Sequence, residues 1–596
     1  MNLKKSLHVL KRNSLLLIKS IRLDYAYFVL QLFWVLFGSA ITVLNIIIPK
    51  YLIEAVISGE IKVSFIILAG SFGVNIVSSI LEKFISPFFA VRKERINAKV
   101  LDEFLNKSFS LELVNFDDSK FYDKYSIVFD NCCTITHTTM DAFLSVVSSL
   151  TQIALVFTTL LWMNKIVFAI MVAVTIIQLL IDKKRKNIQY DYQRHVAKDN
   201  RQLNYLYRLF YVPQFMRDIR VNSLKDYVFS KKAEATDSLI NNIKETQSKL
   251  SVITLVLSVF SHLETLLISA YFVMKAYQGY MLVGDFYVSL NSYNSLKRSI
   301  ASLFETYNTL YENDLYINDY IYFMNIGQME NAIEGENQLA DIKQIEFKNV
   351  TFAYPNSKEP ALKNVSFTIS QGERIAIVGN NGAGKTTIIK LLLKLYKPQS
   401  GKIKINGINI ERYDVSSLRK AFSVLFQDYT VYPFSVKDNI TLGREVSTEK
   451  IEYALQCVDM LGKIQSLPKG IHTPVTSQML DSGVEFSGGE SQRIALARIY
   501  ANSSGFVVLD EPTSNLDPFI EYKLYKSLLN TLGNKTVIII SHRLTFTYKM
   551  DRILCLNDGV LTEDGSHEEL LKLNGYYSKM YHLSTEKYVT QNTEGG

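Results

Sequence analysis

Eight consecutive residues define the C-terminal half of the chain: Gly379-Asn380-Asn381-Gly382-Ala383-Gly384-Lys385-Thr386. They match the pattern G-x-x-x-x-G-K-[ST], with a predicted strand at 374–378 before them and a predicted helix at 387–395 after them. In this setting the glycines let backbone N–H groups close around phosphates, and the helix N-terminus adds partial positive charge. Lys385 is placed to reach the β- and γ-phosphates of a nucleotide, and the Thr386 hydroxyl is placed to ligate Mg²⁺. The stretch predicts a nucleoside triphosphate site, in which we include the next residue, Thr387.

Short apolar runs of β type surround this motif. They lie at residues 345–347, 374–378, 506–509 and 537–540, and helical stretches separate them. Alternation of this kind predicts an α/β domain built on a largely parallel sheet. Hydrophobicity changes character near Gly335, so we place a linker at 326–342, the α/β domain at 343–580 and a C-terminal tail at 581–596.

Two carboxylates follow the apolar run at 506–509. Asp510 and Glu511 are delivered by what reads as a buried strand. Asp510 is suited to hold Mg²⁺ through water, and Glu511 is suited to polarise an attacking water as general base. The plain alternative is a pair of solvated carboxylates at the end of a strand.

A third motif precedes the predicted helix that ends at Tyr500. Ser487 at the N-cap and Glu490 three residues later form the pattern of a capping box. A capping box does not require the two adjacent glycines between them, Gly488 and Gly489. These glycines would let a bulky anion approach the helix N-terminus closely.

The order of the three motifs resembles that of the ATP-binding-cassette family. The resemblance implies roles for four further residues. Tyr354 would stack on adenine, Gln427 would contact Mg²⁺ and the attacking water, and His542 would contact the γ-phosphate. Asp517, within residues 514–517, would belong to the loop that couples two ATP sites. The catalytic set is then Glu511, His542 and Gln427.

In this family one cassette's Ser-Gly-Gly segment closes on the phosphate loop of another cassette. The chain has one cassette with every motif present, so we expect a homodimer with two active sites; a heterodimer is the alternative. Two residues depart from the family pattern: Phe486 stands where Leu is usual, and Glu490 stands where Gln is usual. The Gly-Glu-rich stretch that exporters tend to carry is poorly matched at 473–483, which leaves the coupling to the membrane domain open.

The first half of the chain has the composition of a membrane domain. A helix needs about 20 apolar residues to cross the hydrocarbon layer. Six windows approach or meet this length, at residues 25–48, 61–80, 140–163, 166–182, 252–274 and 283–304. The sixth carries several polar residues and is assigned from its partner helices and from the family. We therefore predict an α-helical polytopic membrane domain at 25–325, with six transmembrane helices and long cytoplasmic extensions, joined to an α/β P-loop ATPase domain with a helical subdomain.

Charge placement orients this domain. Basic residues cluster before the first window, at 92–99 after the second and at 183–186 after the fourth. The positive-inside rule then puts both termini, including a lead-in at 1–24, and the two long connections in the cytoplasm. Because the excess charge lies beside the membrane, we do not expect nucleic acid as a partner despite the net charge of +8. The four cysteines are too few and too scattered for a disulfide framework or a metal site.

The two long connections, at 81–139 and 182–251, are rich in polar residues at helical spacing. We expect helices that continue into the cytoplasm, each connection interrupted once, at 115–118 and at 211–213. Short transverse helices at these breaks would contact a cytoplasmic partner domain. The alternative is a simple helix hairpin.

Six spans ahead of one cassette resemble an exporter half-transporter, and loosely the bacterial peptide and antimicrobial exporters. The resemblance implies ATP-driven export by alternating access in a bacterial plasma membrane, with the ATPase domain in the cytoplasm. Ionisable groups inside spans are usually functional, and such groups at His262, Glu264, Lys297 and Arg298, with Asn291 and Asn294, favour a peptide or amphipathic cargo. The alternative for them is hydrogen bonding between helices.

Other functions remain as alternatives. A lipid or multidrug exporter would share the same architecture. An ATP-gated channel or regulatory subunit is a less favoured alternative. The spans argue against a soluble cassette ATPase, and the fusion of cassette to spans argues against an importer.

Overall fold

The structure is a computed structural model of the whole chain. It describes residues 3–163, 188, 192, 199, 202–326, 337–476, 483–513 and 518–590, apart from residues 356, 358, 503, 534 and 543. The chain divides into two units. The helical unit comprises Met1–Leu105 and Val128–Ile321, and the α/β unit comprises Asn106–Ile127 and Tyr322–Gly596.

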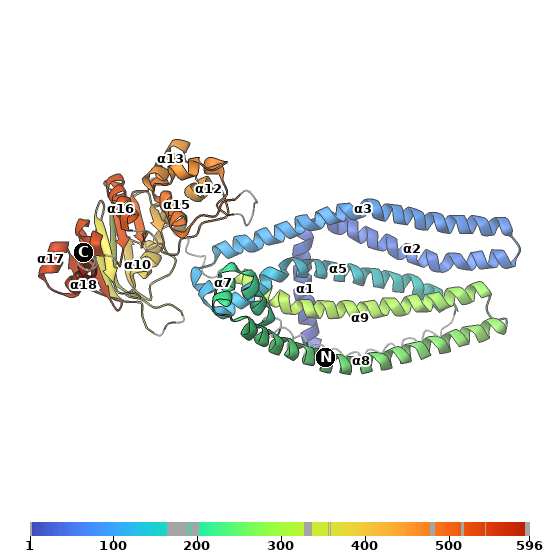
Figure 1. Cartoon of the computed structure of the whole chain (residues 1–596). Helices are drawn as coiled ribbons and strands as arrows, with labels where there is room; N and C mark the ends of the chain where they lie inside the picture. Colours follow the sequence, from blue (N-terminus) through green and yellow to red (C-terminus); the bar gives the residue numbers. More distant parts are fainter. Residues whose placement is uncertain are drawn as a thin grey trace. The chain divides into compact units, whose positions relative to one another are not determined.

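The described part of the helical unit is built from long helices and one short helix. The long helices are α1 (Leu3–Leu23), α2 (Tyr25–Ile57), α3 (Ile61–Ser110), α5 (Ser119–Met163), α8 (Lys225–Tyr277) and α9 (Val283–Asn325), and the short helix is α7 (Pro213–Val221). Helices α2, α3, α5, α8 and α9 run alongside one another, and α1 lies across them (Figure 1). Each predicted window in the described residues lies inside one of these longer helices, so each of these segments continues as a helix past its apolar window.

Four described helical segments are long and apolar enough to cross a membrane. They are Tyr25–Ile57, Ile61–Ser110, Lys124–Phe157 and Lys225–Tyr277. The apolar window of α3 has no buried residue, which is the surface expected of a helix that faces lipid rather than water. The sixth predicted span lies in α9 but is too polar to qualify by composition, and the fourth, 166–182, lies outside the described residues. The described part of the chain therefore supports at least four spans.

Short helices occupy both predicted breaks. Helix α4 (Leu113–Asp117) separates α3 from α5. Helix α7 begins at Pro213, where a missing N–H costs nothing because the first helical residue has no intrahelical partner. The prediction of short helices at 115–118 and 211–213 is thus confirmed.

The sequence interpretation did not foresee α1. Arg12 of this helix makes a paired contact with Asp314 of α9, at 2.8 Å from Nε and 2.6 Å from Nη2. Lys19 contacts Glu103 and Tyr320, at 2.5 and 2.8 Å. The basic residues that were assigned to a lead-in therefore fix α1 against α3 and α9.

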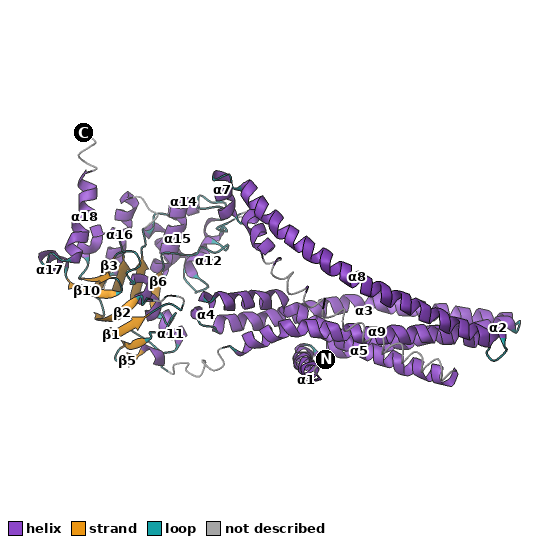
Figure 2. Cartoon of the chain, turned by 90° about the horizontal axis from the view of Figure 1, so that it is seen from below, coloured by secondary structure: helices purple, strands orange, loops and turns teal. Residues whose placement is uncertain are grey.

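Two sheets form the framework of the α/β unit (Figure 2). A four-stranded antiparallel sheet has the order β2-β1-β4-β5, and a six-stranded sheet has the order β10-β9-β3-β8-β7-β6. In the second sheet all neighbours except β10 and β9 are parallel. The strands are β1 (Gln344–Phe352), β2 (Leu362–Ser370), β3 (Arg374–Gly379), β4 (Ser400–Ile405), β5 (Ile408–Asn409), β6 (Phe422–Leu425), β7 (Phe506–Asp510), β8 (Thr536–Ile540), β9 (Arg552–Asn557) and β10 (Val560–Gly565).

The α/β unit also contains helices. They are α10 (Lys385–Leu392), α11 (Val415–Lys420), α12 (Val436–Thr441), α13 (Thr448–Cys457), α14 (Leu461–Gln465), α15 (Gly488–Ala501), α16 (Pro518–Leu532), α17 (His567–Lys572) and α18 (Tyr576–Thr590), with short 3₁₀ turns at Ile410–Arg412, Gly470–His472 and Leu544–Lys549. The four predicted strands are confirmed as β1, β3, β7 and β8. The helix predicted at 387–395 instead runs from Lys385 to Leu392, because Gly384 serves as its left-handed cap and Lys394 leaves the helical region.

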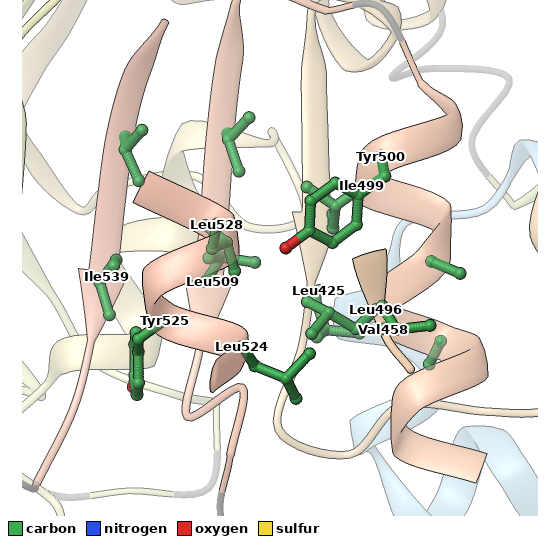
Figure 3. Packing of buried hydrophobic residues seen from close by; sticks show 14 of the residues in the cluster. Leu425, Val458, Leu496, Ile499, Tyr500, Leu509, Leu524, Tyr525, Leu528 and Ile539 are labelled. Atoms are coloured by element: carbon green, nitrogen blue, oxygen red, sulfur yellow. The ribbon is translucent and has the colours of Figure 1, made fainter. Parts of the chain in front are cut away.

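Alternation along the central strands places the sheet between two cores. Val507 and Leu509 of β7 join one cluster with α15 and α16, part of which is seen in Figure 3. Phe506 and Val508 join the other cluster with α10 and the antiparallel sheet. A strand buried on both faces reads as a continuous apolar run, which explains why the sequence 506–509 has no polar residue.

This topology gathers the predicted site residues at one edge. In a parallel sheet the carboxyl ends of neighbouring strands meet, and ligands bind beyond those ends. The phosphate loop follows β3, and Asp510 ends β7. Gln427 follows β6, and His542 follows β8. Four segments distant in sequence therefore converge at this edge, because the strands that precede them are neighbours in the sheet.

Candidate active site

Two glycines of the phosphate loop are required by their surroundings. A Cβ atom on Gly379 would lie 2.2 Å from the backbone oxygen of Leu556, and one on Gly384 would lie 2.5 Å from the backbone oxygen of Ala361. Both residues also have positive φ, +151° and +96°, which L side chains rarely adopt. The loop can follow its path only with glycine at these two positions.

Lys385 is held inside the loop that it belongs to. Its side chain is buried, and Nζ donates to the backbone oxygens of Gly379 and Asn380, each at 2.9 Å. Burial lowers the pKa of this ammonium, and the charges of Glu511 and Asp510 oppose that change. A phosphate bound in the loop would offset the desolvation, because it supplies negative charge next to the ammonium.

Thr386 and Asp510 form a donor set for a hard cation. The Thr386 hydroxyl donates to Oδ2 of Asp510 at 2.7 Å. Asp510 is 1% exposed, and its other oxygen, Oδ1, is buried without a hydrogen-bond partner. Burial raises the pKa of this carboxyl, and the Thr386 hydrogen bond opposes the rise. An unsatisfied buried carboxylate oxygen next to a hydroxyl fits Mg²⁺, which prefers oxygen ligands.

Glu511 brings the three predicted catalytic residues together. Gln427 Nε2 donates to its Oε2 at 2.8 Å, and His542 Nδ1 lies 3.3 Å from its Oε1. Its backbone has a φ of +46°, and its N–H donates to the oxygen of Ile540 at 3.0 Å. A non-glycine residue in this region stores about 1–3 kcal/mol of strain.

Tyr354 lies at the side of the phosphate loop's helix. Its hydroxyl is 3.2 Å from the Thr387 hydroxyl, and its ring packs edge-on against Phe352 and Tyr396, with centroids 5.0 and 5.3 Å away. The Nζ of Lys390 lies 5.4 Å from the ring centroid. The ring is partly exposed and held in place, as a stacking platform for a base requires.

The predicted capping box of α15 is confirmed. Ser487 caps the helix, its hydroxyl accepts from the N–H of Glu490, and the Glu490 carboxylate accepts from the N–H of Ser487. Within the described residues, the side chain of Ser487 has this local partner rather than one in the phosphate loop. Ser487 and Gly488 are exposed, so the helix N-terminus is open to a ligand or to another chain.

Lys463 accounts for both departures from the family pattern. Its Nζ is 2.6 Å from Oε1 of Glu490 and 5.5 Å from the ring centroid of Phe486. The hydrogen bond from Lys463 lowers the pKa of the Glu490 carboxyl. The extra negative charge expected at Glu490 is therefore paired. Sequence reasoning missed Lys463 because it lies on α14, 27 residues before Glu490.

Helix α4 contacts the α/β framework within its own unit. Tyr396 donates to Oδ2 of Asp117 at 2.7 Å, Lys397 Nζ is 2.6 Å from Oε1 of Glu112, and Val114 packs against the core around α10. The expectation that a short helix at the first break contacts the cytoplasmic domain is confirmed. Residues 514–517, with Asp517, lie outside the described part of the chain.

The polar residues of the predicted spans have different surroundings. Glu264 and Lys297 pair with each other at 2.9 Å and are mostly buried, as the helix-packing alternative expects. Arg298 and Asn291 are exposed or half-exposed, and among the described residues their side chains bond only to backbone oxygens of their own helix, α9. The polar residues that were predicted to favour a peptide cargo are therefore divided between a packing contact and open positions.

A phosphate-loop motif lies at the carboxyl edge of a parallel sheet, together with a buried carboxylate beside a hydroxyl and a second carboxylate held by two side chains. This arrangement is typical of a P-loop ATPase. Residues 362–514 match the family described as ABC transporter. The chain is 28% identical over 563 residues to the subtilin transport ATP-binding protein SpaT of Bacillus subtilis, covering 93% of this chain and 91% of that protein. It is 39% identical over 251 residues to the ATP-dependent lipid A-core flippase of Methylobacillus flagellatus, covering 42% of each chain.

The fold has a match in a solved structure. A bacterial Atm1-family ABC exporter with ATP bound superposes with a TM-score of 0.77, at 22% identity, over 93% of this chain and 97% of that chain. The match to the flippase covers only about two fifths of its length. Together, these observations identify the chain as an ABC half-transporter, an integral membrane protein in which a membrane domain is fused to one ATP-hydrolysing nucleotide-binding domain.

Proposed function

We propose that two copies of this chain form an exporter that moves a peptide or amphipathic cargo across the bacterial plasma membrane by alternating access. The observation that carries the proposal is the convergence of Lys385, the Thr386–Asp510 pair and Glu511 at one sheet edge. These residues belong to a chain whose other half is built of apolar helices long enough to span a bilayer.

Each residue of the site has a role in hydrolysis. The loop and Lys385 bind the β- and γ-phosphates of ATP, and Tyr354 stacks on the base. Thr386, Asp510 and Gln427 would hold Mg²⁺, which when bound neutralises charge on the β- and γ-phosphate oxygens. Glu511 accepts a proton from the attacking water, while Gln427 and His542 orient its carboxylate.

Two copies complete the site. Ser487, Gly488 and Gly489 present an open helix N-terminus, which attracts anions, yet the hydroxyl of Ser487 bonds locally within its own chain. We propose that this end closes on the ATP held by the partner's phosphate loop. The test mixes protein that carries Asn380→Cys with protein that carries Ser487→Cys. In the presence of ATP the two should form a disulfide-linked dimer, and the absence of this link would favour a heterodimer.

Closure is passed to the membrane helices through α4. The contacts of Asp117 with Tyr396 and of Glu112 with Lys397 join α4, which connects α3 to α5, to the α/β unit. Movement of the two α/β units together would then move α3 and α5. The cavity between the spans turns outward with ATP bound and returns after hydrolysis.

The cargo assignment follows from where the relatives match. SpaT, whose printed name assigns it to transport of subtilin, matches over the membrane domain as well as the cassette. The lipid A-core flippase matches over 251 residues only. The relation that includes the membrane helices therefore favours a peptide, with a lipid or multidrug exporter as the second candidate and an ATP-gated channel as a third.

The test is stimulation of ATP hydrolysis by purified protein in liposomes. We expect amphipathic peptides to raise the rate in a saturable manner. A response to lipids or hydrophobic drugs alone would replace the peptide exporter with the second candidate, and steady ion currents in a bilayer would favour the channel.

A further inference from the structure

A cavity of about 620 Å³ opens between helices of the helical unit. Its wall is formed by α2, α5 and α9, with Phe89 of α3 at one side. The size falls within the range of sites that hold drug-sized ligands, about 300–1,000 Å³. The lining is unusual for a space among apolar helices, because most of its lining residues carry hydroxyl, amide or charged side chains.

The hydroxyl and amide groups form chains that join the helices. Gln152 donates to Ser148 at 3.2 Å and accepts from Ser299 at 3.0 Å, while Ser302 of α9 contacts both Ser145 and Ser149 of α5. Such bonds are a usual means of holding helices together in lipid. The serines alone therefore carry no inference about a ligand.

Two charged side chains in the same wall are not explained by helix packing. Asp141 of α5 and Arg298 of α9 line the cavity and are exposed. Neither has an ion-pair partner in the part of the chain that the structure describes. Arg298 has only a 3.4 Å contact from Nε to the backbone oxygen of Asn294.

Lys297, the residue before Arg298, is an example of a charge with a structural role. Lys297 lies 2.9 Å from Glu264 of α8 and also bonds to the backbone oxygen of Ser261 at 3.0 Å. The side chain of Glu264 is 6% exposed. One charge of α9 is thus satisfied between two helices, whereas the next charge along the chain is presented to an open space.

Arg298 lies within the hydrocarbon layer if α9 enters the membrane at Val283. It is about 22 Å along α9 from Val283, at 1.5 Å per helical residue, and the hydrocarbon layer is about 30 Å thick. Ionisable side chains in this layer are expensive, and those that are retained without a partner usually serve the transported species. The cost of Arg298 is then offset when cargo is present.

We propose that this cavity binds a segment of a peptide that carries both signs of charge, with the peptide carboxylate on Arg298 and the peptide ammonium or guanidinium on Asp141; this inference rests on the proposed export function. Arg binds carboxylates through two parallel hydrogen bonds. Serine hydroxyls and Gln31 and Gln152 amides can bond to the peptide backbone. Asp141 on the same wall repels a purely anionic headgroup, which distinguishes this cargo from an acidic lipid.

The test uses the full-length protein in liposomes and three synthetic amphipathic peptides. The parent peptide contains one Asp and one Lys, the second has Asn for the Asp, and the third has Gln for the Lys. For the unmodified protein, removal of either peptide charge should raise the concentration for half-maximal ATPase stimulation about tenfold or more, since a hydrogen bond to a charged group contributes about 1.5–3 kcal/mol.

Protein variants then assign each charge. In Arg298→Gln the difference between the Asp and Asn peptides should fall below about twofold, while the Lys and Gln peptides stay distinguished. Asp141→Asn should give the reverse pattern, and Arg298→Lys should restore part of the first difference. Lys297→Gln, the matched neighbour, should lower the melting temperature and leave both peptide differences in place.

The possible results distinguish failure of the proposed binding site from failure of the proposed export function. If no peptide stimulates the unmodified protein, the proposed export of peptides fails. If peptides do stimulate it and the three are equivalent, or Arg298→Gln retains the Asp–Asn difference, the cavity is not the recognition site. The comparison of peptides on the unmodified protein needs no variant, so a folding defect in Arg298→Gln does not prevent the decision.

Discussion

The hydroxyl of Thr386 donates a 2.7 Å hydrogen bond to Oδ2 of Asp510. This bond joins the start of α10 to the end of β7 and so ties the phosphate loop to the strand that carries the candidate base. It leaves Oδ1 of Asp510 buried without a hydrogen-bond partner. The site therefore offers a free oxygen to a cation, and the folded protein is less stable when no cation is bound.

Asp510→Asn should stabilise the nucleotide-free protein. An unsatisfied buried charged group costs about 1–3 kcal/mol or more, and a neutral amide costs less. Because burial raises the pKa of Asp510 in the folded state, ionisation destabilises the fold above that pKa, and the penalty disappears as the pH falls towards the unfolded value near 3.8. The gain in melting temperature from Asp510→Asn should therefore shrink as the pH is lowered from 7.

The same variant should lose the further stabilisation that MgATP gives to the unmodified protein. The control is Glu449→Gln, because Glu449 is exposed. Glu521→Gln would not serve, because Glu521 is buried beside Thr513. A lower melting temperature for Asp510→Asn at every pH would contradict this account of the carboxylate.

Glu511→Gln should bind ATP and fail to hydrolyse it. The amide cannot accept the proton of the attacking water, and general-base catalysis contributes about 10²–10⁴-fold. Single-turnover hydrolysis measures the chemical step, and retention of labelled ATP by the variant measures binding. Hydrolysis within about twofold of the unmodified rate would assign the base to another residue.

Lys463→Met should reduce ATP hydrolysis several-fold by leaving Glu490 uncompensated beside the helix N-terminus that meets phosphate. Lys463 is about half-exposed, so its pair with Glu490 contributes at most about 1 kcal/mol, equivalent to about fivefold. Glu490→Gln should rescue the Lys463→Met variant, because no charge then remains to be paired. Lys420→Met on α11 is the control, and failure of the rescue would show that Lys463 acts by packing on Phe486 instead.

Asp117→Ala should weaken the stimulation of ATP hydrolysis by cargo. It removes the hydrogen bond with Tyr396 and thereby loosens α4 from the α/β unit. We expect cargo stimulation of ATPase activity to fall about threefold to tenfold, which corresponds to the roughly 0.5–1.5 kcal/mol that a typical hydrogen bond contributes, while ATP affinity is retained. Glu112→Gln breaks an exposed pair and should have a smaller effect. Equal effects of the two would argue against a specific role for Asp117.

Features encoded by local spacing could be predicted from the sequence. The phosphate loop, the four strands and the capping box at Ser487 each depend on residues a few positions apart. The roles of Gln427 and His542 came from resemblance, since nothing near them in the chain points to Glu511.

Features formed by distant residues could not be predicted. Lys463 reaches Glu490 from another helix, and Asp117 meets Tyr396 across 279 positions. The polar residues of α8 and α9 looked alike in sequence, and only their neighbours in space separate Lys297 from Arg298. Helix α1 was missed because its basic residues were interpreted as a charged lead-in, whereas they pair with α3 and α9.

The most direct test of the account is uptake of a labelled amphipathic peptide into inside-out membrane vesicles that contain the full-length protein. We predict accumulation that requires hydrolysable ATP and that falls to the protein-free background with Glu511→Gln. Accumulation that continues in Glu511→Gln, or that does not depend on ATP, would contradict the claim that hydrolysis at this site drives export.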